Sequence, residues 1–183
     1  DSSAAIDTMT RKLIALGRER ELPQVILNNK TALGDDLGAL LYHIQSTFGG
    51  VCRPVNLPAD GGTSVIDCFK NATGESDLGD VADFHTGIVD QVVEVDEELM
   101  EAYLEQGEVS PDQLHGPFEA SLRQGHLVPV MFMSAKTGVG VQEFMDFIAE
   151  LCPNPLEGNP RTFIINEGDA QEEWHASSED EHA

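Results

Sequence analysis

Apolar residues near the start of the chain recur at helical spacing. Between residues 6 and 16 they fall three or four positions apart, which is the period of an amphipathic helix that buries one side. Pro23 ends the pattern, because proline is poorly tolerated inside a helix. The sequence therefore predicts an opening helix. The residues expected on its buried side are Ile6, Met9, Leu13 and Leu16.

A short strand and a second helix are expected next. Residues 25–27 form a continuous apolar run, which favours a strand buried on both faces over a half-exposed one. Either Asp35 or Asp36 can cap the helix that follows, and Gly49 ends it. The order helix, strand, helix is typical of an α/β fold.

The middle of the chain has a different pattern. Residues 52–58 and 63–69 predict two strands joined by a turn at residues 59–62. Apolar positions between residues 81 and 104 then predict a long helical region with a break near Val95.

One more helix is expected before the chain returns to an apolar strand. Ser110 is a good N-cap residue, Pro111 suits the first turn, and Gly125 ends the pattern. Pro117 should interrupt or kink this helix, because proline removes a backbone N–H and crowds the preceding turn.

Strand, loop and helix follow each other again near the end of the chain. Residues 127–133 form an apolar run, residues 134–138 form the polar loop "SAKTG", and residues 141–151 have an amphipathic helical pattern. From residue 158 onward the periodicity is lost and acidic residues dominate, which predicts a linker or a disordered tail.

The candidate chemistry lies in two loops. Asn28-Asn29-Lys30 follows the first predicted strand, and Ser134-Ala135-Lys136 follows the last. In a doubly wound α/β sheet, ligands bind beyond the carboxyl ends of the strands. We therefore expect the two loops to be neighbours in space although they are far apart in sequence.

Composition narrows the range of partners. The chain has 183 residues and a formal net charge of -23, so nucleic acid and anionic membranes should repel it. We find no signal peptide and no apolar run long enough to span a membrane. Its 3 cysteines have no paired spacing, which indicates reduced thiols in a cytoplasmic protein.

Acidic residues are concentrated in one segment. No Lys or Arg lies between Lys70 and Arg123. This segment is either a solvated helix face or a surface that docks a basic partner, and the sequence leaves both open. The histidines lack the spacing of a metal site, so no metal ligand is expected. The crowded acids are Glu94, Asp96, Glu97, Glu98, Glu101 and Glu105.

The two polar loops match the chemistry of guanine. Guanine presents two adjacent donors, N1–H and the exocyclic amine, beside the O6 acceptor. The carboxylate of an Asn-Lys-x-Asp motif accepts both donors, and a backbone N–H of a Ser-Ala-Lys motif can donate to O6. Adenine inverts this pattern, and a site built in this way can reject it by about 10⁴–10⁵-fold. Each motif alone is typical of an ordinary turn, but both after apolar strands indicate a nucleotide site.

With these motifs the chain resembles translation elongation factor G, and more closely the shorter elongation-factor-G-like branch of bacterial translational GTPases. The stretches that carry the resemblance are "RKLIALGRERELPQVILNNK", "DLGALLYHIQSTFGGVCRPVNLP", "VVEVDEELMEAYLEQGEVSPDQL" and "GHLVPVMFMSAKTGVGVQEFMDFIAELCPNP".

The resemblance implies a P-loop-type GTPase domain, or G domain, with an inserted α+β subdomain called G′. It implies four parts: residues 1–50 as part of the G domain, residues 51–125 as the G′-like insertion, residues 126–157 as the G domain continued, and residues 158–183 as an acidic linker.

The family's phosphate-binding elements are missing from this sequence. No G-x-x-x-x-G-K-[ST] occurs in it, so nothing here can cradle phosphates or place Mg²⁺. The resemblance therefore implies a fragment, the second half of a G domain. GTP or GDP would bind in the intact parent, and Mg²⁺ only with the missing half. We expect no catalytic residue in this chain and no GTP hydrolysis by the chain alone.

The family's Asn-Lys-x-Asp motif fits this sequence in two registers. Matching Asn-Lys directly puts Ala32 in the place of the acid, whereas alignment without a gap to the following helix puts Thr31 there. Neither register supplies the carboxylate that recognises guanine. The implied base-binding residues are Asn29, Lys30, Ser134, Ala135 and Lys136, with Asn28 and Thr31 in the second register.

Three functional hypotheses remain open. The first is the base-binding half of a ribosome-associated GTPase, whose G′ region in the standard factor contacts the ribosomal stalk protein. The second is an acidic interaction module that docks a ribosomal or other basic protein and keeps a vestigial nucleotide site. The third is an unrelated α/β nucleotide-binding protein with convergent loops. No membrane and no direct DNA binding is expected.

The resemblance also predicts self-association. In the family the strand at residues 25–27 has a further neighbour in the sheet, and that neighbour would precede this sequence. Without it, the strand presents an apolar edge that can pair with another chain.

Overall fold

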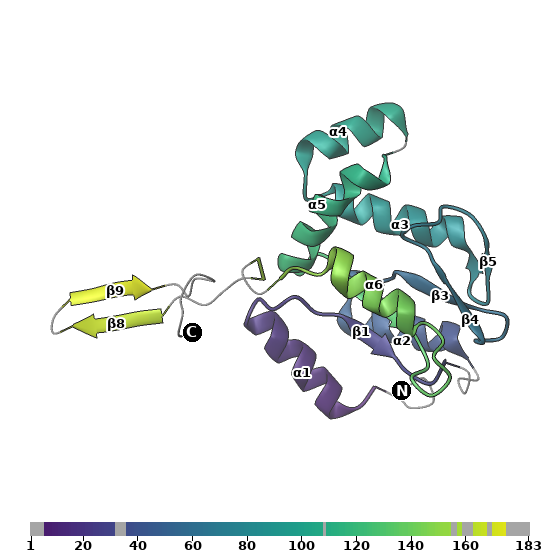
Figure 1. Ribbon diagram of the computed structural model, residues 1–183, viewed down its shortest axis with the longest axis horizontal. Helices are drawn as coiled ribbons and strands as arrows, with labels where there is room; N and C mark the ends of the chain where they lie inside the picture. The colour runs from purple at the N-terminus through teal and green to yellow at the C-terminus, as the bar shows by residue number, and fades with distance from the viewer. Residues whose placement is uncertain are drawn as a thin grey trace.

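The computed structural model describes residues 6–31, 36–107, 109–154, 157–158, 163–167 and 170–174. Within these residues a three-stranded parallel sheet forms the centre of the fold (Figure 1). Its order is β1 (Ile26–Asn28), β7 (Val128–Phe132) and β2 (Cys52–Pro54), so the strand latest in sequence lies in the middle. The α/β class expected from the sequence is confirmed.

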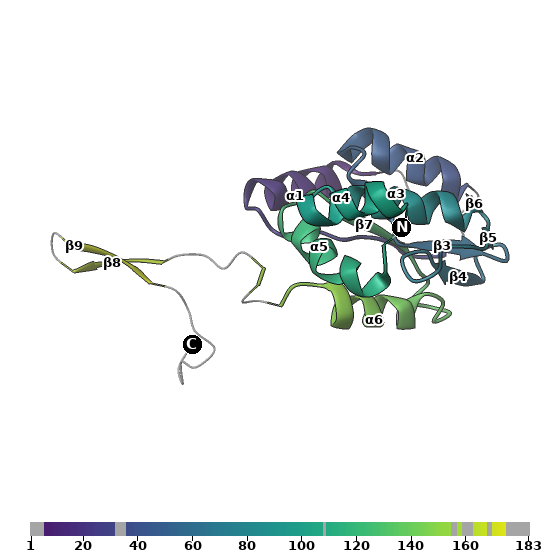
Figure 2. The same ribbon diagram turned by 90° about the horizontal axis from the view of Figure 1, so that it is seen from above.

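Helices cover both faces of this sheet. Helices α1 (Thr8–Glu19) and α2 (Leu37–Phe48) lie on one face, and α6 (Val141–Leu151) lies on the other (Figure 2). Alternate residues of β7 divide between the two layers, because successive side chains of a strand point to opposite faces. Val128, Val130 and Phe132 pack with α2, whereas Met131 packs with α6.

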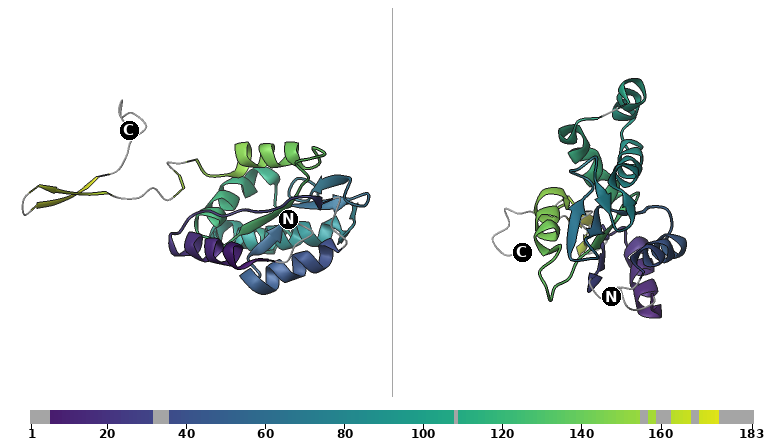
Figure 3. Two further views of the ribbon diagram at one scale, coloured as in Figure 1. Left: turned by 90° about the horizontal axis from the view of Figure 1, so that it is seen from below. Right: turned by 90° about the vertical axis from the view of Figure 1, so that its right-hand side faces the viewer.

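The region between β2 and β7 forms a small α+β unit. Within the described residues α3, α4 and α5 are separated by a break near Val95 and another near Gly107, and α4 lies at the opposite end of the folded body from α1 (Figure 3). The elements of the unit are β3 (Asn56–Ala59), β4 (Ser64–Asp67), β5 (Glu75–Ser76), β6 (Gly79–Asp80), α3 (Val81–Val93), α4 (Glu97–Gln106) and α5 (Pro111–Arg123).

Two details of this unit differ from the sequence-based expectation. Helix α5 continues through Pro117, so of the two expected effects, an interruption or a kink, the interruption is absent. The run expected to be one strand at residues 52–58 divides at Val55 into β2 and β3. β2 pairs with β7 in the central sheet, while β3 pairs with β4.

The first helix forms where expected but buries a different side. Only Gly17 is buried in α1, and the partly buried Ile14 packs against the α2 core. Of the four residues expected on the buried side, Ile6 is partly buried and packs against the same core. The other three point to solvent, because α1 has no neighbour on that side among the described residues. The exposed fractions are 61% for Met9, 59% for Leu13 and 40% for Leu16.

Strand β1 likewise is not buried on both faces. Ile26 packs with the α2 core, but Leu27 on the opposite face is 38% exposed. β1 is an edge strand among the described strands, with β7 as its neighbour. It therefore does not have the burial on both faces that a continuous apolar run normally indicates.

The expected unstructured tail contains a strand pair. β8 (Phe163–Glu167) and β9 (Ala170–Trp174) are antiparallel, with Phe163 opposite Trp174. The β-branched and aromatic residues at 163–165 favour a strand, a local signal that the acidic composition obscured. No helix within the described ranges is long and apolar enough to cross a bilayer.

A buried amide attaches the hairpin β3–β4 to the central strand. The Asn56 side chain is 1% exposed, its Oδ1 accepts from the Phe132 backbone N–H at 2.7 Å, and its Nδ2 donates to the Phe132 carbonyl at 3.0 Å. One side chain thereby satisfies both backbone groups of Phe132, the last residue of β7, which lies two residues before Ser134.

Replacement of Asn56 should therefore be costly. Asn56→Ala leaves two buried backbone groups of Phe132 without partners, and we expect a loss of about 2–4 kcal/mol in the free energy of unfolding. Urea denaturation followed by circular dichroism measures this. The matched control is Asn71→Ala, since Asn71 is exposed and its amide donates a single hydrogen bond, to the Asp67 carbonyl. Equal destabilisation by both substitutions would contradict the assignment.

Candidate functional site

The carboxyl ends of β1 and β7 bring the two polar loops into contact. The parallel register pairs Asn28 with Phe132, so the residues that follow them lie side by side. The Asn29 Oδ1 accepts a hydrogen bond from the Ala135 backbone N–H at 3.0 Å, across 106 residues of sequence. It also accepts from the Lys30 backbone N–H at 2.8 Å. One amide oxygen therefore ties the Asn-Lys loop to the Ser-Ala-Lys loop.

Backbone geometry then turns the first loop away from the strand. Lys30 has a φ of 67°, a left-handed conformation that few residues other than glycine adopt. Its side chain is exposed. Thr31 follows with 1% exposure, and both its backbone N–H and its hydroxyl donate to the Met133 carbonyl. The Thr31 side chain is thus directed into the protein and not toward a ligand beyond the strand ends.

This geometry favours one of the two registers. With Asn29 as the asparagine of the motif, its side-chain amide connects the two loops by accepting from the Ala135 N–H. In this register the position of the acid falls on Ala32, which lies outside the described residues. The alternative puts Thr31 in the place of the acid, but that hydroxyl is already engaged with Met133. Asp36, the nearest described carboxylate in sequence, caps α2 by accepting from the Ala39 N–H at 2.8 Å.

The second loop is a compact turn with its own hydrogen bonds. Ser134 is 3% exposed; its N–H donates to the Val139 carbonyl at 2.8 Å, and its own carbonyl accepts from the Gly138 N–H at 2.8 Å. Ala135 and Lys136 lie exposed at the outer side of this turn. The backbone of Ala135 and the side chain of Lys136 are therefore exposed to solvent, while hydrogen bonds of Ser134 with Gly138 and Val139 connect the two ends of the loop.

Gly140 closes this turn at a position that only glycine fits well. Its φ is 72°, and a Cβ placed there would approach the Phe132 carbonyl oxygen to 2.5 Å. Helix α6 starts at the next residue. The close approach of backbone to backbone sets where α6 begins relative to β7, and so fixes the shape of the loop between them.

A buried polar group lies beneath the first loop. The Asn28 side chain is 4% exposed, and its Nδ2 has no hydrogen-bond partner among the described residues. Asn28 shares a face of β1 with Ile26, which is the α2 side of the sheet. An unsatisfied buried donor of this kind costs about 1–3 kcal/mol, so this position favours an additional acceptor.

Among the described residues the arrangement offers donors for a planar base but no acceptor pair. The Ala135 N–H is the group that could donate to a guanine O6, and here it is engaged by Asn29. Lys30 and Lys136 are exposed on the two loops, one on each. A base that enters must share or replace the bond between Asn29 and Ala135.

No cluster of three or more His, Cys, Asp or Glu residues suited to a metal ion occurs within the part of the chain that the structure describes. Burial raises the pKa of the thiols of Cys52, Cys68 and Cys152, which disfavours the reactive thiolate.

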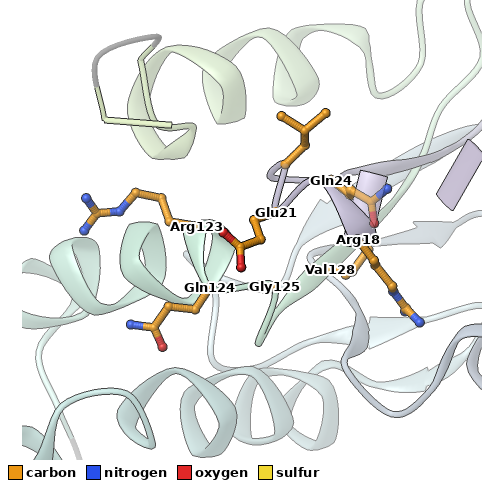
Figure 4. Close-up of a pocket in the computed structure, with 8 residues that line it drawn as sticks. Arg18, Glu21, Gln24, Arg123, Gln124, Gly125 and Val128 are labelled. Carbon is orange, nitrogen blue, oxygen red and sulfur yellow. The ribbon is translucent and has the colours of Figure 1, made fainter. Parts of the chain in front are cut away.

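A cavity of about 440 Å³ lies at the other end of the sheet. It borders Val128 at the start of β7, whereas the two loops follow the end of β1 and of β7. Figure 4 shows that the guanidinium groups of Arg18 and Arg123 point away from each other and not into a shared pocket. The cavity is therefore separate from the loops and is not a convergent anion site.

Comparison with known proteins identifies a similar fold. No protein-family model matches the chain. A crystal structure of a protein from Thermus thermophilus is similar to 85% of the chain, with a TM-score of 0.72 and 29% sequence identity. The match takes in 26% of that protein, so the chain spans about a quarter of the length of the structure that it resembles.

Sequence reasoning missed the residues that support the loops. Asn56 and Gly140 do not belong to either motif, yet they fix the last residue of β7 and the turn after it. The available signals were weak: Asn56 is a polar residue within an apolar strand pattern, and Gly140 precedes a helix without a capping side chain.

Gly140→Ala should disturb the second loop. The added Cβ meets backbone and not a flexible side chain, and alanine is strained at this φ, so we expect a loss of about 1–3 kcal/mol in the free energy of unfolding. Hydrogen exchange of the amides of residues 134–141 measures the local effect. The control is Gly116→Ala in α5, where no atom lies within 4 Å of the added Cβ. Unchanged protection in the Gly140 variant would refute the close-packing argument.

Proposed function

We propose that this chain is the guanine-base-binding half of the G domain of a translational GTPase resembling elongation factor G. The observation that carries the proposal is the hydrogen bond from the Ala135 N–H to the Asn29 Oδ1. It joins the two loops that the motifs single out, at the carboxyl ends of adjacent parallel strands, where such sheets bind ligands.

The unit between β2 and β7 supports the same proposal. It is an α+β unit inserted between the Asn-Lys loop and the Ser-Ala-Lys loop, as the resemblance to a G domain with a G′ insertion implies. The match to about a quarter of a longer protein agrees with a parent that supplies further parts. In this proposal the parent is cytoplasmic, acts on the ribosome and provides the P-loop, the switches and Mg²⁺.

Within that parent this chain's residues would bind and orient the base. The exposed stem of Lys30 can cover one face of the base, and the Ala135 N–H can donate to its edge where the base shares or replaces the Asn29 Oδ1. No described carboxylate takes the place of the missing acid. The proposal therefore includes weaker discrimination between guanine and adenine than a complete Asn-Lys-x-Asp motif gives.

A nucleotide titration tests the proposal. We expect GMP to shift the amide resonances of residues 29–31 and 134–137 in ¹H–¹⁵N NMR spectra of the full chain. AMP should shift them less at the same concentration, because its base edge presents the opposite donors and acceptors. Asn29→Ala should weaken GMP binding by about 5–10-fold, since it removes one hydrogen bond between the loops.

The control for this titration is Asn71→Ala, an exposed asparagine outside both loops. Identical shifts with AMP and GMP, or shifts confined to residues outside the two loops, would count against a guanine site.

A second candidate function is favoured by the surface of α4. This helix exposes Glu97, Glu98, Glu101 and Glu105, and Leu104 among them is 75% exposed. An exposed leucine within an acidic helix suits a partner with a basic and partly apolar surface, such as a ribosomal protein. In this case the nucleotide loops would be vestigial.

Charge reversal on α4 tests this second candidate. Glu97→Lys combined with Glu101→Lys should reduce co-sedimentation of the chain with purified ribosomes. Added salt should also reduce co-sedimentation of the unmodified chain, because it screens the attraction between charges. Glu75→Lys, on β5 away from α4, serves as the control. Equal recovery of all three proteins with ribosomes would exclude α4 as the contact.

A further inference from the structure

The donor side of the base site is a backbone group in a well-held turn. Ala135 lies exposed on the outer side of the Ser-Ala-Lys turn, and its N–H donates to the Asn29 Oδ1 at 3.0 Å. The buried Ser134 holds the turn through the hydrogen bond from its N–H to the Val139 carbonyl. A backbone N–H can donate to the O6 of a purine, but not to a 6-amino group, which is itself a donor. This group therefore suits a 6-oxopurine that shares or replaces its bond to Asn29.

The described residues offer no side-chain acceptor for the neighbouring edge of the base, where guanine carries N1–H and its exocyclic amine. The Thr31 hydroxyl is buried and donates to the Met133 carbonyl. The Asp36 carboxylate caps α2 by accepting from the Ala39 N–H at 2.8 Å. Ala32, which stands in the place of the acid, carries a methyl group, and a methyl group accepts no hydrogen bond.

Charge at the two loops also favours acceptors on the ligand over donors. Residues 28–31 and 134–140 contain Lys30 and Lys136 and no Asp or Glu. Both lysines are exposed, one on each loop. The exocyclic amine of guanine is a donor, so these cations attract the O6 of the base but give the amine nothing to bind.

We propose that this site binds 6-oxopurine nucleotides whether or not the base carries an amine at position 2, so that inosine nucleotides bind as well as guanine nucleotides. The proposal rests on the base site of the proposed function and goes beyond it by naming O6 as the group that is recognised. Hypoxanthine, the base of inosine, has the same O6 and N1–H as guanine and lacks only the exocyclic amine.

The expected affinities differ clearly from those of a site that has the acid. Where a carboxylate accepts from the amine, loss of that charged hydrogen bond weakens binding by about 10–150-fold. Where no acceptor faces the amine, it stays bonded to water, and its loss should change the dissociation constant by less than about 3-fold. Adenine brings a donor to the Ala135 N–H, so AMP should bind at least about 10-fold more weakly than IMP.

Titration of the full 183-residue chain with IMP, GMP and AMP, followed in ¹H–¹⁵N NMR spectra, tests the proposal. The three nucleotides share the ribose and the 5′-phosphate, so differences between them report on the base. IMP and GMP should shift the Ala135 amide with dissociation constants equal to within about 3-fold. A GMP affinity at least about 10-fold above that of IMP overturns the proposal and leaves the guanine site of the proposed function standing. No shift at either loop with any of the three overturns both.

A variant that supplies the acid tests the cause. Ala32→Asp should separate GMP from IMP by at least about 10-fold, because the new carboxylate can accept from the exocyclic amine that only GMP carries. The matched control is Ala72→Asp, which adds the same charge at an exposed alanine outside both loops and should leave IMP and GMP equal. Equal affinities in the Ala32→Asp variant would overturn the proposal, since the missing acid would then not be the reason for them.

Asp35 provides a second control, because it is the other carboxylate between the first loop and α2 besides the cap Asp36. Asp35→Ala should leave the ratio of the IMP and GMP affinities unchanged. A preference for GMP in the unmodified chain that disappears in Asp35→Ala would identify Asp35 as the acceptor of the amine and would overturn the proposal.

Discussion

The parallel pairing of β7 with strands on both sides is the constraint on which this fold depends. All five residues of β7 are buried, and its alternate side chains supply both hydrophobic layers. Pro129 is tolerated in this central strand because β1 pairs with it only from Val130 onward, so the missing N–H falls just before the ladder begins. The position of β7 also determines where the two loops of the candidate site lie, because one loop follows β7 and the other follows its neighbour β1.

The predictable part of the structure is the part with local signals. The helix at residues 141–151 has the predicted bounds, because amphipathic spacing, a preceding glycine and a following proline agree there. The break near Val95 was visible for the same reason: Asp96 caps the next helix by accepting from the Leu99 N–H. Where sequence pattern, capping and turn residues all favour the same structure, the tertiary packing of the fold does not change it.

Two of the expectations that proved wrong concern which side of an element is covered. A continuous apolar run at residues 25–27 does imply two covered faces, yet β1 lies at an edge among the described strands. The stripe on α1 is exposed because no described element covers it. Local pattern also could not show that β2 joins the central sheet, since that depends on pairing with a strand about 75 residues later. The contact between Asn29 and Ala135 was foreseen only because both motifs were recognised together.

The same strand order has a consequence during synthesis of the chain. Asn29 and Ala135 are 106 residues apart, so at about 5–20 residues per second β1 leaves the ribosome roughly 5–20 s before its partner β7 exists. Throughout that interval β1 lacks β7, the strand whose backbone pairs with it. Until β7 is made, β1 can bury its apolar side chains only by collapse with α1 and α2, and its backbone groups must remain bonded to water.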